Sequence, residues 1–237
     1  MSDLDRLLDL QANDTETDRA RHRRATLPEL AAIADLDARE AAARAAIAEP
    51  AAERAEVHRE QKRLEDEVAT IEAKVAHVNH QLYEEGLTSP KEAQALQADL
   101  ESLRRHQGEL EDQVLELMER REPLDAAVEE SDALLATIDA DRTAQCAALA
   151  AGQAAIDAEL ADLAAARASL VAPIPASLLD EYERIRVSAD GVGVARLSGS
   201  TCTGCHLSLA AAEVDAIKRA SADAFHHCPD CGRLLVP

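Results

Sequence analysis

The chain of 237 residues carries 46 Asp and Glu side chains against 25 Lys and Arg, which gives a formal charge of −21. It contains 51 alanines but only two tyrosines, one phenylalanine and no tryptophan. Abundant alanine and charged residues with few aromatic residues, glycines and prolines are typical of long helices and coiled coils. This composition argues against a compact β-rich enzyme, and the net charge argues against nucleic-acid binding by bulk attraction.

The sequence gives no sign of a membrane protein or of export from the cell. No apolar stretch reaches the roughly 18 residues of a membrane-spanning helix, and the acidic N-terminus lacks the basic and then apolar order of a signal peptide. Four of the five cysteines form two Cys-x-x-Cys pairs, which favours metal binding over disulfides. We predict a cytoplasmic protein without membrane insertion, in which the fifth cysteine, Cys146, packs as a small helical residue.

The first arm of a helical hairpin is predicted from residue 61 onward. Its apolar positions alternate steps of four and three, the spacing of a helix that packs against a partner helix. These positions are Leu64, Val68, Ile71, Val75, Val78 and Leu82. The pattern then stops where Gly86 suits a helix end and Ser89 before Pro90 suits the start of the next helix. We therefore predict a tight turn near residues 86–90.

A second seam with the same spacing follows this turn. Its positions are Leu96, Leu100, Leu103, Gln107, Leu110, Val114, Leu117, Arg121, Leu124, Val128, Ser131, Leu135 and Ile138. When the chain folds back at the turn, Ile71 lies opposite Leu103 and Leu64 lies opposite Leu110. Each seam then fills the other, as an antiparallel coiled coil requires.

Prolines divide the chain further. A proline removes a backbone donor and bends or breaks a helix, so we expect kinks near residues 28, 50 and 123. Two prolines at 173 and 175 end the second arm. We assign the hairpin to residues 1–172 and a second domain to 173–237, in which short helices alternate with glycine-punctuated strands. The prediction is a mainly α fold, a long antiparallel coiled-coil hairpin followed by a small α+β domain.

The C-terminal domain contains the paired cysteines Cys202, Cys205, Cys228 and Cys231. Each Cys-x-x-Cys turn presents two thiolates on one side of a tight loop, and two turns 22 residues apart supply the four sulfurs of a tetrahedral zinc ribbon. The alternative, two separate redox pairs, is disfavoured by their closeness in sequence. Four thiolates leave no open position, so we expect one structural Zn²⁺ without hydrolytic chemistry. The histidines at 206, 226 and 227 are expected not to be ligands.

Several segments resemble a bacterial protein family. The run LYEEGLTSPKEAQALQADLESLRRHQGELEDQVLELME (Leu82–Glu119) resembles the signature hairpin of proteins that join a long antiparallel coiled coil to a C-terminal C4-type zinc ribbon domain. The segment Leu7–Ile33 and the motifs YERIR, GSTCTGCHLSL and CPDCGRLL resemble the same family. The resemblance implies this fold. It also implies chaperone-like adaptors, tied in some bacteria to flagellar or secretion-system assembly, and a proposed binding of nucleic acid by the ribbon.

Our first functional hypothesis is a non-enzymatic adaptor, a rod with a zinc-ribbon head that binds protein clients as a monomer or weak homodimer. The alternative is a protein that binds RNA or DNA through basic side chains of the ribbon. These are Arg184, Arg186, Arg196, Lys218, Arg219 and Arg233. Acidic residues outnumber basic ones in this domain, and aromatic stacking platforms are nearly absent.

Two further groups of residues are interpreted as ordinary helix surface. The basic run at residues 19–24 is expected to be a solvated helix face paired with nearby carboxylates. His77 and His80, three residues apart near the hairpin turn, are expected to form a surface pair rather than a metal site. An enzyme is disfavoured because no glycine-rich phosphate loop or nucleophile elbow appears.

Overall fold

The computed structural model describes residues 3–83, 89–219 and 225–237. Three long helices come first: α1 (Asp3–Ala25), α2 (Pro28–Tyr83) and α3 (Pro90–Val171). The remaining elements are α4 (Ala176–Ser188), β1 (Val194–Ser198), β2 (Thr201–Cys202), α5 (Ala211–Arg219), β3 (His226–His227) and β4 (Leu234–Val236). The mainly α fold predicted from the sequence is confirmed.

The chain divides into two compact units, Ile33–Ala144 and a second unit that combines Met1–Ala32 with Gln145–Pro237. We call them the hairpin unit and the head unit. This division differs from the boundary predicted between residues 172 and 173. The reason is that α1 supplies part of the core of the C-terminal domain, which the heptad pattern did not reveal.

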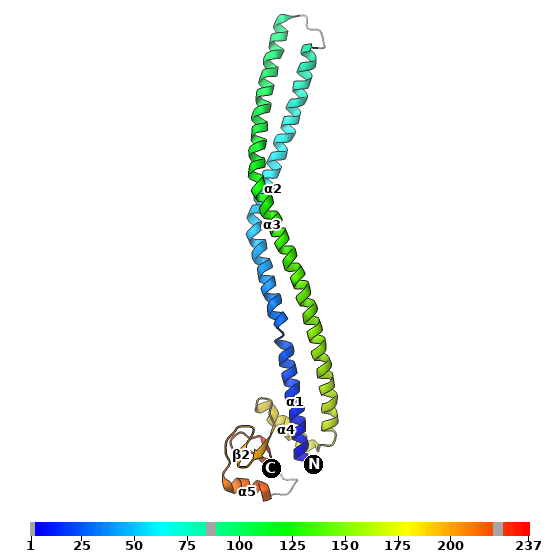
Figure 1. Cartoon of the computed structure of the whole chain (residues 1–237), viewed down its shortest axis with the longest axis vertical. Coiled ribbons are helices and arrows are strands. Elements are labelled where there is room, and N and C mark those ends of the chain that lie inside the picture. The colour runs from blue at the N-terminus through cyan, green and yellow to red at the C-terminus, as the bar shows by residue number, and fades with distance from the viewer. Residues whose placement is uncertain (1–2, 84–88, 220–224) are drawn as a thin grey trace. The chain divides into compact units, whose positions relative to one another are not determined.

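In the hairpin unit, α2 and α3 run antiparallel and side by side (Figure 1). As residue numbers rise along α2, those of the polar partners on α3 fall: Arg142 donates to Glu40, Arg120 to Glu53 and Gln107 to Glu72. The apolar seam lies between them, with Leu64, Ile71 and Leu110 buried and five further seam residues half-buried around them. These five are Val68, Val75, Leu103, Val114 and Leu117. The predicted pairing of two heptad seams is confirmed.

The helix ends follow the local sequence signals. Of the predicted turn near residues 86–90, residues 86–88 lie outside the described part of the chain. Ser89 lies directly before α3, and its carbonyl accepts the backbone N–H groups of Glu92 and Ala93, in the first turn of that helix, at 3.1 and 3.2 Å. At the other proline positions, α1 ends before Pro28 opens α2, whereas α2 and α3 continue through Pro50 and Pro123.

The strands of the head unit form one mixed sheet in the order β2-β1-β4-β3. β1 pairs parallel with β4, which places Val194 beside Leu234, and the outer strands β2 and β3 are antiparallel to their neighbours. Because side chains alternate between the two faces of a strand, this short sheet separates two cores.

One face of the sheet packs against α1 and α4. Its core combines residues of α1, α4, β1 and β4 with Ile174 from the segment between α3 and α4: Leu4, Leu7, Leu10, Ile174, Leu178, Tyr182, Ile185, Val194, Leu234 and Val236. The other face packs against α5 and the cysteines. That core contains Ala195, Leu197, Cys202, Leu209, Val214, Ile217, Cys228 and Leu235. The sheet therefore connects the cysteine cluster to the N-terminal helix.

Polar contacts reinforce the packing of α1. The buried Gln11 amide donates to the Gly191 carbonyl at 2.8 Å and accepts the Gly193 N–H at 2.6 Å, like a neighbouring strand. Gly193 itself has room only for hydrogen, because a Cβ there would lie 2.7 Å from the Tyr182 ring. Within the described ranges, no helix has the length and apolar character required to cross a bilayer.

Candidate metal centre

The four paired cysteines converge at one end of the sheet. Their sulfur atoms all lie within 4.8 Å of one another, with Sγ–Sγ distances of 3.9 Å from Cys202 to Cys231 and 3.7 Å from Cys205 to Cys228. A tetrahedron of sulfurs at the usual Zn–S distance of about 2.3 Å has edges of about 3.8 Å. The donor set therefore fits one tetrahedral Zn²⁺ held by four thiolates.

Two equivalent backbone turns present these sulfurs. In the first, the Cys202 N–H donates to the Leu207 carbonyl and the His206 N–H returns to the Cys202 carbonyl, at 3.0 and 2.8 Å. In the second, the Cys228 N–H donates to the Arg233 carbonyl and the Gly232 N–H returns to the Cys228 carbonyl, at 2.8 and 2.9 Å. The same pattern of hydrogen bonds thus holds both pairs, which accounts for the repeated Cys-x-x-Cys spacing.

Burial and one arginine set the protonation of the thiols. Cys202 and Cys228 are buried and the other two cysteines are half-buried. Burial raises the pKa of the Cys202 thiol and raises that of Cys228 to about 12. At Cys231 burial acts in the same direction, but hydrogen bonds from the backbone and side chain of Arg233, together with those from Cys228 and Cys205, outweigh it and lower the pKa to about 7. Zinc binding must therefore displace protons from the buried thiols.

Comparison with known proteins agrees with this site. Residues 10–190 match the family model of the CT398-like coiled coil hairpin domain, and residues 201–235 match the C4-type zinc ribbon domain. The chain belongs to the CT398-like coiled coil hairpin family. The resemblance noted from the sequence is thereby confirmed, and the zinc ribbon carries one structural zinc ion as its cofactor.

Relatives share the whole architecture. Uncharacterized protein Rv2229c of Mycobacterium tuberculosis is 33% identical, with the alignment covering 97% of this chain and 93% of that protein. A solved structure from Mycobacterium smegmatis is 27% identical and covers 100% of this chain and 99% of its own, with a TM-score of 0.83. CT398 from Chlamydia trachomatis, 19% identical, covers 98% of this chain and 96% of its own with a TM-score of 0.66, which shows the common fold.

The histidines near the four cysteines and the fifth cysteine are not part of the metal site in the described structure. No histidine joins the sulfur cluster in the part of the chain that the structure describes. His227 instead contacts Glu181 of α4 at 3.0 Å. The remaining cysteine, Cys146, is exposed on α3, so the prediction that it packs as a small helical residue is wrong.

Two of the six basic residues predicted to bind nucleic acid, Arg233 and Arg186, make hydrogen bonds or ion pairs within the protein. The Arg233 side chain donates to the carbonyls of Ala189 and Val192 at 3.0 Å each and to that of Gly204 at 3.4 Å. A Cβ at Gly204 would lie 2.7 Å from Arg233 Cδ, so glycine is needed for this approach. Arg186 is 18% exposed and its guanidinium contacts Asp18 at 2.6 Å.

The other four basic residues lie at the surface without forming one described cluster. Arg184 pairs with Glu181 on α4, Arg219 pairs with Asp215 on α5 at 3.3 Å, and Arg196 of β1 lies 3.9 Å from Asp5. Lys218 is exposed on α5. Ribbon binding to nucleic acid stays a prediction, with three of these four cations already next to carboxylates.

The basic run of α1 is paired in the same way, as the sequence suggested. Four ion pairs connect it to carboxylates: Arg19–Glu16, Arg21–Asp18, Arg23–Glu159 and Arg24–Asp157. The last two reach across to α3 within the head unit. This run therefore fastens α1 to α3.

Sequence reasoning missed the buried carboxylate of Asp14. Only 2% of this residue is exposed, and it accepts hydrogen bonds from Tyr182 Oη at 2.9 Å and Arg167 Nε at 2.7 Å. Burial, followed by the charge of Asp14, raises the pKa of Tyr182. A signal exists in the sequence, because Asp14 and Gln11 continue the helical spacing of Leu4 and Leu7 on α1.

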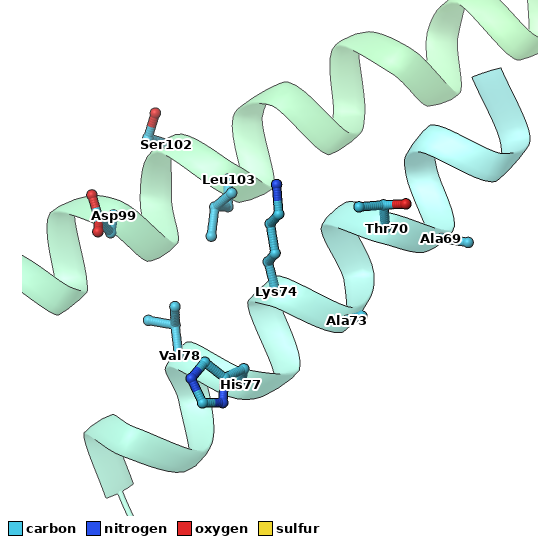
Figure 2. A pocket seen from close by; sticks show the side chains of 9 residues that line it. All are labelled: Ala69, Thr70, Ala73, Lys74, His77, Val78, Asp99, Ser102 and Leu103. Carbon is cyan, nitrogen blue, oxygen red and sulfur yellow. The ribbon is translucent and has the colours of Figure 1, made fainter. Parts of the chain in front are cut away.

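A groove of about 910 Å³ lies between α2 and α3 near the end of the hairpin unit. Val78 of α2 and Leu103 of α3 point toward one another across it, and Lys74 extends from α2 toward α3 (Figure 2). His77 and Asp99 also line it.

Proposed function

We propose that this protein is a non-enzymatic, chaperone-like adaptor that binds protein clients through its helical hairpin and its zinc ribbon. The observation that carries this proposal is the exposure of large apolar side chains along α3: Leu115, Met118 and Leu134 are 56%, 45% and 44% exposed. Apolar side chains at a helix surface favour contact with another protein. The matched families are a coiled-coil hairpin and a zinc ribbon, neither of which is an enzymatic family.

The metal centre supports the same proposal. Four sulfurs fill the coordination of zinc, so no position remains for water or substrate. The metal then stabilises a small domain with few large apolar residues, which offers a rigid surface for recognition. We also propose that the protein acts in the cytoplasm, because a reducing compartment keeps such thiols free for zinc.

Crosslinked capture of the tagged protein from its native cells tests the proposal. The sample is split into a nuclease-treated half and an untreated half, with an untagged strain as control. We expect specific protein partners in both halves. Recovery of RNA or DNA, with protein partners lost after digestion, would instead favour nucleic-acid binding, and the exposed cations Arg184, Arg196 and Lys218 would then be the first to mutate.

A further inference from the structure

Two adjoining hollows follow one flank of the hairpin unit, the first between α2 and α3 and the second along α3 alone. They have volumes of about 320 and 420 Å³ and share Leu115 in their walls. The first lies over Val68, Ala69 and Val114, and the second continues along α3 over Met118. We call this surface the Leu115 groove, with Val68, Val114, Leu115 and Met118 as its floor.

The floor of the Leu115 groove is more apolar than a two-helix coiled coil requires. Val114 belongs to the seam between α2 and α3, whereas Leu115 and Met118 lie one position beyond the seam residues Val114 and Leu117. Positions that flank a seam normally carry charged residues. Leu115 and Met118 widen the apolar stripe of α3 instead, and they stay about half exposed. A broad stripe of this kind is typical of a helix that contacts two partner helices.

The rim of the groove is acidic. Five glutamates line the two hollows: Glu65, Glu72, Glu111, Glu119 and Glu122. Among the described residues, no Lys, Arg or His lies within ion-pair distance of these five, although many surface carboxylates elsewhere are paired. The arginine in the groove, Arg121, is already engaged by Asp125 at 3.0 Å and by Gln61 at 2.8 Å. The rim therefore presents uncompensated negative charge.

We propose that the Leu115 groove docks a basic amphipathic helix of a protein partner. The apolar face of that helix would cover Leu115 and Met118, and its Lys and Arg residues would meet the glutamate rim. The groove follows α3 from Glu111 to Glu122 at least, about 17 Å at 1.5 Å per residue, so three to four helical turns fill it. The inference rests on the proposed adaptor function and names the chemistry of the client segment.

Charge favours this occupant over a second copy of the chain and distinguishes this groove from the one in Figure 2. A second copy of this chain, with a net charge of −21, would bring further carboxylates to a rim that has no free cation. The groove of Figure 2 lacks such a bias, because Lys74 and Asp99, which carry opposite charges, both line it. Among the hollows described for the hairpin unit, the Leu115 groove is the one that combines exposed large apolar residues with glutamates that have no ion-pair partner.

A peptide-binding experiment with the full-length, zinc-loaded protein tests the groove. The probe is a designed Leu/Lys peptide of about 18 residues, long enough for a stable helix, with leucines at i, i+3, i+4 and i+7. A second peptide has the same composition in scrambled order. Fluorescence anisotropy at about 150 mM salt, where long-range attraction is screened, should show about tenfold tighter binding of the patterned peptide.

Matched variants separate the groove from bulk charge. The double variant Leu115→Ser/Met118→Ser, which keeps the charge, should weaken binding of the patterned peptide about tenfold, equal to about 1.4 kcal/mol. Leu134→Ser, at a similarly exposed position of α3 outside the groove, should leave binding unchanged. The double variant Glu65→Gln/Glu111→Gln should weaken binding of the patterned peptide and reduce the salt dependence of that binding. Glu129→Gln/Glu130→Gln, which removes the same charge from α3 outside the groove, should have a smaller effect on both. Circular dichroism checks that every variant keeps its helices.

The outcomes are distinct from those for the adaptor function. Equal binding of both peptides, or equal binding by groove and control variants, would overturn the groove. Sedimentation in which the wild type is a dimer and Leu115→Ser/Met118→Ser is a monomer would also overturn the proposal, because the groove would then be occupied by a second copy of the chain. Client capture that is unchanged by the double variant would also overturn the groove and keep the adaptor function. Absence of any protein client from wild-type capture would overturn the adaptor function itself.

Discussion

The two compact units of this protein are stabilised by different means. In the hairpin unit, a single repeated seam buries Leu64, Ile71 and Leu110, and the surrounding ion pairs are exposed. In the head unit, a short sheet separates two cores, one sealed by α1 and the other by the cysteine cluster. Beside the first core, the buried carboxylate of Asp14 on α1 binds side chains from α3 and α4.

The difference shows how sequence separation affects sensitivity to mutation. A coiled-coil seam is a series of similar contacts, so one substitution removes one local contribution and its neighbours remain. The head unit brings together residues separated by more than 150 positions, as Asp14 and Arg167 show. Its small cores leave few contacts to compensate for a lost one. We therefore expect substitutions in the head unit to act cooperatively and those in the hairpin unit to act locally.

The largest expected effect is loss of the metal site. Cys202→Ser or Cys231→Ser should release zinc and unfold the ribbon, because structural zinc contributes about 10 kcal/mol or more to folding of such sites. The helical signal of α2 and α3 should be retained, which would display the independence of the two units. Metal analysis and circular dichroism measure both quantities. Cys146→Ser, at an exposed cysteine, is the control, and a full equivalent of zinc in Cys231→Ser would contradict the four-thiolate site.

Removal of the buried carboxylate comes next. Asp14→Ala should lower the free energy of unfolding of the head unit by about 3 kcal/mol, since Tyr182 Oη loses its partner in a buried position and Arg167 loses one of two carboxylates. Hydrogen exchange of the α4 and β1 amides measures the stability of the head unit separately from that of the hairpin unit. Asp9→Ala, at an exposed position of α1, is the matched control. Equal protection in both variants would show that the carboxylate does not hold the core.

A seam substitution should have a smaller and more local effect. Leu110→Ala removes a buried side chain of the hairpin unit and should cost about 2 kcal/mol, toward the low end for core leucines because a two-helix interface can partly collapse. Leu115→Ala on the same helix should cost much less, as Leu115 is 56% exposed. Urea unfolding followed by circular dichroism compares the two. A loss of zinc from Leu110→Ala would contradict the independence of the units.

The contrast between the units also explains what could be predicted from sequence. The seam around Leu64, Ile71 and Leu110 and the paired cysteines follow from local spacing, since heptads and Cys-x-x-Cys turns involve neighbours along the chain. The place of α1 in the head core depends on contacts with residues more than 150 positions away. Local patterns carry no information on such partners.

Charged residues show the same limit. Sequence supplies the sign of a charge but not its surroundings, so it does not distinguish Arg186 and Arg233 from cations at the surface. In the structure Arg233 binds backbone carbonyls and Arg186 binds Asp18. By contrast, the pairing of the arginines at 19–24 with carboxylates was predictable in part, because Glu16 and Asp18 lie one helical turn away.

Tyr182 gives a weaker test that depends on pH. Burial and the neighbouring carboxylate raise its pKa above the ordinary value of 10, so the neutral phenol is favoured in the folded head unit. Its contribution is complete below pH 10 and is lost as the pH rises through the folded-state pKa. Tyr182→Phe should lower stability by about 1 kcal/mol at neutral pH and reduce the loss above pH 10. An identical alkaline loss in this variant would assign it to other groups.

The smallest expected effect is on zinc affinity, and it comes from a difference between the two cysteine turns. His206 and Gly232 occupy the same position after their Cys-x-x-Cys pairs, and both have the left-handed φ that favours glycine, 62° and 72°. His206→Gly should therefore tighten zinc binding about twofold, equal to about 0.4 kcal/mol, while His206→Val should weaken it because a β-branched residue is strained there. Competition with a chromophoric chelator measures both. Weaker zinc binding by His206→Gly would mean that the imidazole stabilises the turn by more than the backbone strain at His206 destabilises it. The two cysteine turns would then share a backbone conformation but differ in what stabilises them.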